Sequence, residues 1–307
     1  MKGPRIKPRA LKPGDTIGVV APSAAVERER LERGVAAIEN LGFRVKVSAH
    51  ALDRVGILAG GDAVRAGELS AFFADPAIDA IFAARGGYGC GRLLPLLDFA
   101  AIARTPKVFV GFSDASFLLN ALVERAGMVC FHGPMVAMDF ARRLSPPSLD
   151  HLCRLLSGEL RSFELRARST LRHGVAEGEV VGGCLSMVAG TLGTPYAPPF
   201  DGSMLFLEDT GEKAYRIDRM LVHLAQAGAL ERIAGIVFGA MRPPNGDEAE
   251  YRMIEQCVAD WAEDLNCPVL WGVEAGHGSA NFTIPFGVRA RIDSQTRTLA
   301  FLEPAVS

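Results

Sequence analysis

The chain has 307 residues, with 33 Lys and Arg against 35 Asp and Glu, so its formal net charge is −2. Apolar residues make up 49% of the sequence and charged residues 22%, which is typical of a globular protein with a large core. This composition excludes a disordered chain, a collagen, a coiled coil and a polytopic membrane protein. With no basic block, it also argues against nucleic acid or a membrane surface as the main partner. At about 150 residues per domain, the length predicts two domains.

The N-terminal segment is basic but reaches Pro13-Gly14-Asp15 before any long apolar run, so we expect no secretory signal. No run of about 18 apolar residues follows, and no membrane span is expected. We therefore predict a cytoplasmic protein, whose cysteines are buried thiols rather than disulfides or zinc ligands. None of the six has CxxC spacing: Cys90, Cys130, Cys153, Cys184, Cys257 and Cys267.

Short apolar runs alternate with helical patterns in the first half of the chain. The predicted strands are 16–22, 43–48, 80–85, 107–112 and 129–132. The predicted helices are 26–41, 64–73, a short one beginning at Cys90, and 115–125. Such alternation is typical of βαβ units. The sequence therefore predicts an α/β fold, in which residues 1–160 form a doubly wound, mainly parallel sheet of the flavodoxin or Rossmann type.

The stretch 142–179 interrupts this rhythm, with Pro146-Pro147, a predicted helix at 149–156 and a polar, Arg-rich segment. We expect a linker at 161–178. Beyond it, the apolar runs predict a β-rich α/β domain at 179–307 with antiparallel character at its end. Its predicted strands lie near 180–183, 204–209, 233–241, 268–273, 288–293 and 298–302, and its helices at 214–227 and 248–264.

A candidate nucleophile lies in the segment KVFVGFSDAS, where Ser113 follows a predicted strand and precedes a helix. With Gly111 and Ala115 on either side, the segment resembles the nucleophile elbow G-x-S-x-G. Such a turn lifts the serine hydroxyl above the sheet and presents the N–H of Asp114 to an oxyanion. Ser113 as a plain helix N-cap fits the same pattern, so both interpretations stay open.

The glycine-rich segment AARGGYGCGR lies at the end of another predicted strand and includes Gly86, Gly87, Gly89 and Gly91. Glycine lets a ligand approach bare backbone N–H groups, so the segment can supply an oxyanion donor or hold a phosphate. It matches neither G-x-G-x-x-G nor G-x-x-x-x-G-K, so support for nucleotide binding is weak. A turn that only permits close packing is an equal alternative.

A serine nucleophile needs a base and an orienting carboxylate. His277 lies between two glycines just after a predicted strand, and Glu208 stands at the end of the apolar run MLFL. A solvated loop histidine and a helix-capping carboxylate are the alternatives. His132 closes a strand, where structural burial is expected more than a supporting role in a site.

Taken together, these segments resemble the LD-carboxypeptidases of serine peptidase family S66, which includes muramoyltetrapeptide carboxypeptidases and microcin C7 self-immunity hydrolases. The resemblance runs over nearly the whole chain. The motifs that carry it are PGDTIGVVAPS, RGGYGCGRLLPLLD, GFSDAS, VGGCLSMVAGTLGTPY, FLEDTGEKAYRIDRML and GHGSANFTIPFG. It implies a two-domain α/β protein whose nucleophile comes from the first domain and whose other two triad members come from the second.

The resemblance implies a catalytic triad of Ser113, His277 and Glu208. It places the oxyanion hole at the backbone of Asp114 with Gly86 or Gly87. It implies that the protein uses no cofactor and no metal. It also implies that the substrate is a murein tetrapeptide, which loses its terminal D-alanine in cell-wall recycling. Cys184 departs from the family pattern, where asparagine is more usual, and this leaves the shape of the pocket open.

Arg85 is a candidate for holding the substrate's terminal carboxylate, by charge and position only. A homodimer is expected as the commonest assembly. Two other functions remain: a hydrolase of peptidyl or aminoacyl nucleotides, and a non-catalytic binding module. The first needs an aromatic platform for the base, whereas Trp261 and Trp271 both have the pattern of core residues.

Overall fold

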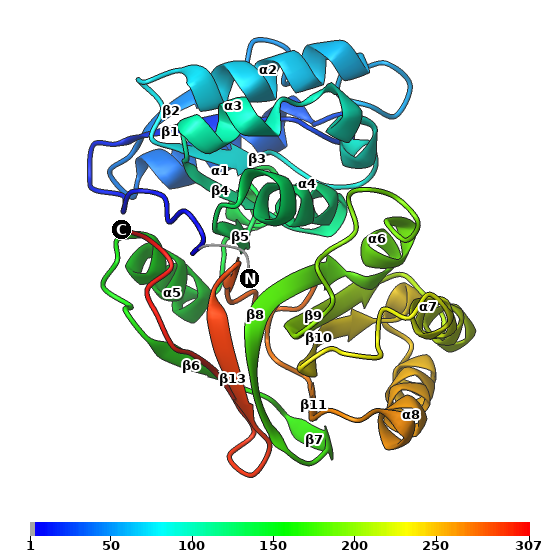
Figure 1. The fold of residues 1–307 in the computed structure, drawn as a ribbon. Coiled ribbons are helices and arrows are strands. Elements are labelled where there is room, and N and C mark those ends of the chain that lie inside the picture. Colours follow the sequence, from blue (N-terminus) through cyan, green and yellow to red (C-terminus); the bar gives the residue numbers. More distant parts are fainter. Residues whose placement is uncertain (1–3) are drawn as a thin grey trace.

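The structure, a computed structural model, describes residues 4–307 and contains two β-sheets, each with its own helices (Figure 1). The first sheet has the strand order β12-β5-β4-β3-β1-β2. Its strands are parallel except β12, which runs antiparallel to β5. The bounds are β1 Thr16–Val20, β2 Arg44–Val47, β3 Ala80–Ala83, β4 Val108–Gly111, β5 Cys130–His132 and β12 Ile284–Phe286.

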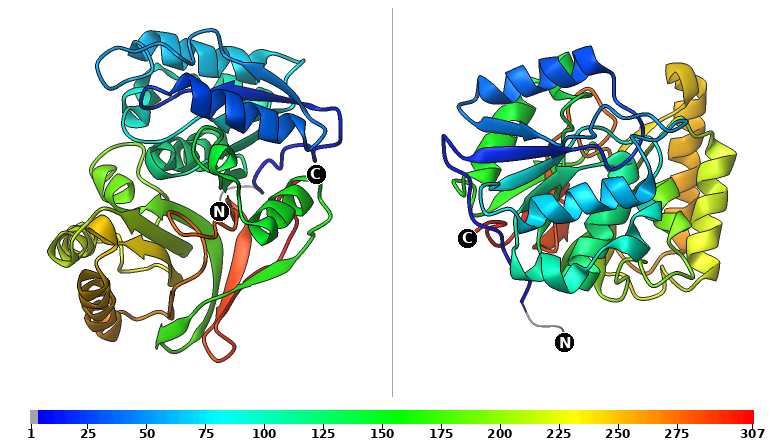
Figure 2. Two further views of the ribbon diagram at one scale, coloured as in Figure 1. Left: turned by 180° about the vertical axis from the view of Figure 1, so that it is seen from behind. Right: turned by 90° about the horizontal axis from the view of Figure 1, so that it is seen from above.

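Helices cover both faces of the first sheet, as the predicted doubly wound fold requires. Seen from above, α1 lies on one side of the sheet and α2 on the other (Figure 2). Gly18 in β1 permits this packing, because a Cβ there would lie 2.5 Å from the Phe72 ring of α2. The helices are α1 Arg28–Glu39, α2 Asp62–Ala74, α3 Phe99–Arg104, α4 Ser116–Ala121 and α5 Pro146–Leu156.

The second sheet has the order β6-β14-β13-β8-β9-β10-β11-β7. Its central strands β8 to β11 are parallel, while β13, β14, β6 and β7 pair antiparallel. This confirms the expected β-rich architecture. The bounds are β6 Phe163–Arg166, β7 Ser169–Arg172, β8 Val175–Cys184, β9 Ser203–Thr210, β10 Gly235–Arg242, β11 Val269–Trp271, β13 Arg289–Asp293 and β14 Thr298–Phe301. The helices are α6 Leu185–Gly190, α7 Ala214–Gln226 and α8 Glu248–Asp264.

The segment 161–178, where the sequence suggests a linker, is built into the second sheet. It contains β6 and β7, which form the two edges of that sheet, and the start of β8. Edge strands face solvent on much of their surface, so they carry charged side chains; only Leu165 of β6 is buried. The polar pattern of an edge strand therefore resembles that of a loop.

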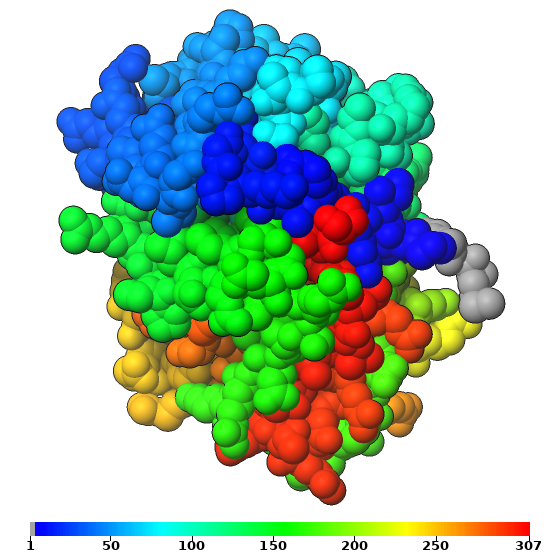
Figure 3. Space-filling model, turned by 90° about the vertical axis from the view of Figure 1, so that its left-hand side faces the viewer, coloured from blue at the N-terminus to red at the C-terminus, as the bar shows by residue number. Residues whose placement is uncertain are grey.

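The C-terminal part of the chain also returns to the first sheet. Strand β12 pairs with β5, with Ile284 opposite His132 and Phe286 opposite Cys130. The two chain ends meet as well: Ala10 N–H donates to the carbonyl of Ser307 at 3.1 Å. The contact of N-terminal and C-terminal segments is visible on the surface in Figure 3. The two halves of the sequence are thus interleaved, and the site is built from both.

Candidate active site

The turn after β4 has the geometry of a nucleophile elbow. Ser113 adopts a φ of +61°, in the left-handed region that non-glycine residues rarely occupy. An N-cap residue has extended backbone instead, and the cap of this helical turn is Phe112, with no side-chain capping bond. Gly111 allows the tight turn, since a Cβ there would lie 3.0 Å from the Cβ of Ala115 and 3.1 Å from that of Ala83. The geometry therefore fits the elbow and not the simple cap.

The glycine-rich segment lies directly against this serine. A Cβ on Gly86 would stand 2.9 Å from Ser113 Cβ, 3.0 Å from its Oγ and 3.4 Å from Asp114 N. Gly87 has a φ of +109°, which an L side chain rarely adopts. The Asp114 carboxylate accepts the N–H of Cys90 at 2.8 Å and so joins the serine turn to the glycine segment. Gly86 is thus close to both the Ser113 side chain and the backbone N–H of Asp114.

Two arginines lie next to this glycine segment, and Arg65 is hydrogen-bonded to it. Arg85, the candidate for binding a substrate carboxylate, donates from Nη1 to the carbonyl of Ala25 at 3.1 Å. Arg65 of α2 is 2% exposed and donates from Nη1 to the carbonyls of Pro22 and Gly89. Sequence reasoning missed Arg65, because one charged residue in an amphipathic helix gives no sign that it points inward.

Glu208 and His277 form a close pair. Glu208 lies near the end of β9 and is fully buried; its Oε2 lies 2.6 Å from His277 Nδ1 and accepts the His277 backbone N–H at 3.2 Å. Gly276, with a φ of +94°, makes room for the carboxylate, because a Cβ there would lie 2.5 Å from Oε2. The strand end and the glycine-flanked loop therefore meet as the expected base and carboxylate must.

Burial and charge act in opposite directions on the pair. Burial alone would raise the pKa of Glu208, but attraction to His277, the hydrogen bond from its ring and the nearby His132 outweigh it and lower the pKa to about 2. Burial opposes protonation of His277, yet the Glu208 carboxylate raises the His277 pKa above its usual value of 6.5. Asp209, buried beside Glu208, has its pKa raised to about 6. At neutral pH, Glu208 is an anion and orients the imidazole.

The serine turn and the histidine loop are neighbours. The ring of Phe112, next to Ser113, lies 4.8 Å from the His277 ring, centroid to centroid. Among residues 4–307, Ser113 Oγ makes no hydrogen bond to His277. In serine hydrolases this bond commonly tightens only when substrate is bound. The structure therefore places Glu208 against His277, and His277 against Phe112, the residue before Ser113.

For His132, the sequence favoured structural burial over a supporting role in the site, but the structure places it next to Glu208. It closes β5, is fully buried, and its Nε2 lies 3.6 Å from the free oxygen of Glu208, Oε1. Cys184, the departure from the family pattern, pairs with Glu208 across β8 and β9. The thiol is buried, and burial raises its pKa well above the usual value. Cys184 therefore lies beside Glu208 as a neutral thiol.

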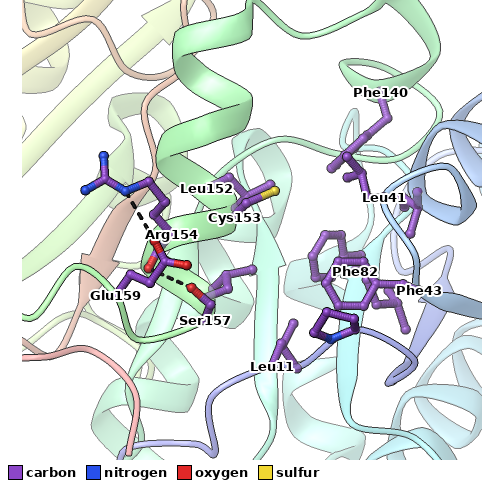
Figure 4. Close-up of a pocket in the computed structure, with 14 residues that line it drawn as sticks. Leu11, Leu41, Phe43, Phe82, Phe140, Leu152, Cys153, Arg154, Ser157 and Glu159 are labelled. Atoms are coloured by element: carbon purple, nitrogen blue, oxygen red, sulfur yellow. Dashed lines mark hydrogen bonds and ion pairs between the residues drawn. The ribbon is translucent and has the colours of Figure 1, made fainter.

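Two cavities lie on different parts of the molecule. One, of about 250 Å³, borders Asp114 and lies between the glycine segment and the residues after α6, with Tyr88, Arg92, Phe117, Thr191 and Tyr196 among its walls. The other, of about 230 Å³, lies between α5 and the first sheet and has an apolar lining that includes Phe82 and Leu152 (Figure 4). None of the three triad candidates lines either cavity, but the first one borders Asp114, the residue that follows Ser113.

No helix in residues 4–307 is both long and apolar enough to cross a membrane. All six cysteines are free; Cys90, Cys130, Cys184 and Cys267 are buried, while Cys153 and Cys257 are partly exposed. In the same part of the chain, no three His, Cys, Asp or Glu side chains cluster as metal ligands.

Two family models match the sequence along most of its length. The LD-carboxypeptidase N-terminal domain matches residues 17–133, and the LD-carboxypeptidase C-terminal domain matches residues 177–292. The chain belongs to the LD-carboxypeptidase family. Membership in the LD-carboxypeptidase family supports a hydrolase and confirms the resemblance drawn from the motifs.

Individual LD-carboxypeptidase relatives cover nearly the whole chain. A probable murein peptide carboxypeptidase of Bacillus subtilis is 36% identical over 98% of this chain and 95% of its own length. The murein tetrapeptide carboxypeptidase of Pseudomonas aeruginosa is 32% identical over 90% and 92%. The crystal structure of an MccF-like protein from Bacillus anthracis superposes with a TM-score of 0.88 at 28% identity, over 96% of this chain and 99% of that one. These matches confirm the fold class.

Proposed function

We propose that this protein is a serine LD-carboxypeptidase that removes the terminal D-alanine from murein tetrapeptide during cell-wall recycling. The observation that carries the proposal is the 2.6 Å contact between the buried Glu208 and His277, whose ring packs beside the Ser113 elbow. The names of the two murein peptide relatives support the substrate.

The chemistry follows from these positions. Since Nδ1–H of His277 is donated to Glu208, its Nε2 carries the lone pair and acts as the base. Ser113 Oγ attacks the carbonyl carbon of the bond to D-alanine, and its proton passes to Nε2. When the carbon–nitrogen bond breaks, that proton goes to the departing amine. Water then attacks the ester and gives a proton to His277, which passes it to Ser113 Oγ as the ester bond breaks. The shortened peptide leaves as a carboxylic acid and ionises to the carboxylate.

The negative oxygen of the tetrahedral intermediate needs donors that are already in place. The backbone N–H groups of Asp114 and of Gly86 or Gly87 fill this role, because the glycine segment lies against the serine without intervening side chains. Arg85 is the candidate partner of the terminal carboxylate, and the cavity beside Asp114 is the space for the remainder of the peptide.

The direct test is incubation with purified murein tetrapeptide, followed by mass spectrometry. We expect loss of one alanine with wild-type protein and none with Ser113→Ala. Labelling with a serine-reactive fluorophosphonate tests the nucleophile independently of substrate choice. A protein that is not labelled at Ser113 and leaves the tetrapeptide intact would favour the non-catalytic binding module.

A second candidate is a hydrolase of peptidyl or aminoacyl nucleotides, favoured by the close structural match to the MccF-like protein. The same fold and triad would serve both reactions, so only the group beyond the cleaved bond differs. Parallel assays with murein tetrapeptide and an aminoacyl sulfamoyl adenosine separate the two. We expect cleavage of the tetrapeptide at a higher kcat/KM than that of the nucleotide.

A further inference from the structure

The two oxygens of Glu208 have different partners. Oε2 receives both the ring and the backbone N–H of His277, whereas Oε1 has no hydrogen-bond partner within 3.5 Å. The side chain is fully buried. Burying a carboxylate oxygen without a hydrogen-bond donor is energetically unfavourable, so a donor for Oε1 is expected nearby.

His132 offers that donor. Its Nε2 lies 3.6 Å from Oε1, and neither of its ring nitrogens has another hydrogen-bond partner. Packing alone orients the ring: its centroid lies 5.6 Å from Phe112, 5.1 Å from Phe206 and 5.6 Å from Phe286. This aromatic cage restrains the ring with Nε2 toward the carboxylate.

The surroundings contain few other charges. On β9, Asp209 lies next to Glu208, and its carboxylate accepts hydrogen bonds from the backbone N–H groups of Ser186 and Thr210. Asp139, in the segment after β5, accepts the N–H of Met135. The remaining titratable groups are His277 on its loop and the buried thiol of Cys184 on β8. None of them is hydrogen-bonded to Oε1.

We propose that His132 is a positioning residue for the catalytic carboxylate, with its Nε2–H directed at Oε1 of Glu208. This inference rests on the triad of the proposed function. Glu208 would then be held between two imidazoles, with one oxygen for each. Because His132 takes part of the negative charge, less of it acts on His277, which stays a base closer to neutral pH.

The position of His132 links it to the nucleophile as well. In the first sheet it pairs with Gly111 of β4, two residues before Ser113, and with Ile284 of β12, seven residues after His277. The contact with Glu208 joins this sheet to the second. His132 therefore connects the strand of the serine with the carboxylate that orients the base.

Three variants test this role. His132→Phe keeps an aromatic ring in the cage and removes the donor, while His132→Gln restores an N–H near the place of Nε2. His151→Phe is the matched control, because His151 is also a buried histidine in an aromatic setting but donates elsewhere, to the carbonyl of Thr283. For each, kcat/KM for tetrapeptide and the rate of fluorophosphonate labelling are measured against pH.

We expect His132→Phe to move the acid limb of both profiles upward by about half a pH unit or more. We expect its plateau rate to fall about tenfold or more, since the carboxylate loses one anchor. His132→Gln should recover most of both effects, and His151→Phe should leave the acid limb in place. A folded His132→Phe protein with unchanged limb and rate would overturn the proposal.

Two further outcomes are interpreted separately. If His132→Phe does not fold, the comparison of His132→Gln with the shorter His132→Asn replaces it; identical profiles for those two would overturn the proposal. If the wild-type protein neither cleaves tetrapeptide nor labels, the proposed function fails. The pKa of His277, followed by NMR of imidazole-labelled protein, still tests His132, since its removal should raise that pKa.

Discussion

The side chain of Asn120 in α4 brackets the peptide backbone of Gly182 in β8. Its Nδ2 donates to the Gly182 carbonyl at 2.7 Å and its Oδ1 accepts the Gly182 N–H at 3.0 Å. One element follows the nucleophile turn, and the other lies beside the strand of Glu208. This pair of hydrogen bonds therefore joins the helix that follows Ser113 to the strand beside that of Glu208.

Asn120→Ala should destabilise the protein and lower its activity. Both polar atoms of Gly182 become unpaired in a buried place, which should reduce the free energy of unfolding by about 2–4 kcal/mol. Urea unfolding and tetrapeptide turnover measure the two effects. Gln256→Ala is the control, because its amide bonds only Asp260 on the exposed face of α8. Equal stability of the two variants would contradict the role given to Asn120.

Ser113→Gly should be inactive yet more stable than Ser113→Ala. Both lack the hydroxyl, but alanine keeps the Cβ that is strained at a φ of +61°, whereas glycine tolerates this conformation. We expect a difference in unfolding free energy of about 1 kcal/mol in favour of glycine. Calorimetry of the two variants provides the measurement. A less stable glycine variant would show that the turn stores no strain.

Gly86→Ala should stop the chemistry without unfolding the protein. The new methyl group would lie 3.0 Å from Ser113 Oγ and 3.4 Å from Asp114 N, where it obstructs the oxyanion position. Loss of an oxyanion site costs about 10²–10³ in turnover. Gly67→Ala in α2 is the matched control, as nothing lies within 4 Å of its added Cβ. Turnover near wild type in Gly86→Ala would remove the glycine segment from the mechanism.

The reaction should depend on pH through His277. Because the pKa of His277 is raised above 6.5, labelling of Ser113 should increase with pH through a midpoint above that value. Glu208→Gln removes the charge that raises this pKa, so its midpoint should move down while its maximal rate falls on the order of 10²–10⁴-fold. Fluorophosphonate kinetics from pH 5 to 9 measure both changes.

The same carboxylate should stabilise the fold in a pH window of its own. The pKa of Glu208 is lowered from 4.5 to about 2, so its contribution is complete above pH 4.5 and is lost as the pH falls toward 2. Wild type should therefore exceed Glu208→Gln in stability by more at pH 7 than at pH 2.5. Urea unfolding at these pH values checks this, and a constant difference would contradict the assigned ionisation.

Residues whose role depends on the local chain were visible in the sequence. The turn at Ser113 needs small neighbouring residues, and the loop of His277 needs glycine where a carboxylate lies close. Both requirements are therefore visible in the residues that flank Ser113 and His277 in the sequence. His132 and Asn120 contact groups that are distant in the sequence, Glu208 and Gly182. The residues next to them in the chain do not indicate these contacts. The edge strands β6 and β7 were hidden for another reason, since solvent-facing strands and loops share a polar composition.

Strand β12 has a consequence for the biosynthesis of the protein. The first sheet receives its last strand from residues 284–286, although its other five strands end by residue 132. While the ribosome is still adding the intervening residues, β5 has an open edge that can pair with another nascent chain. We therefore expect a product that stops short of β12 to aggregate rather than persist as a smaller folded unit.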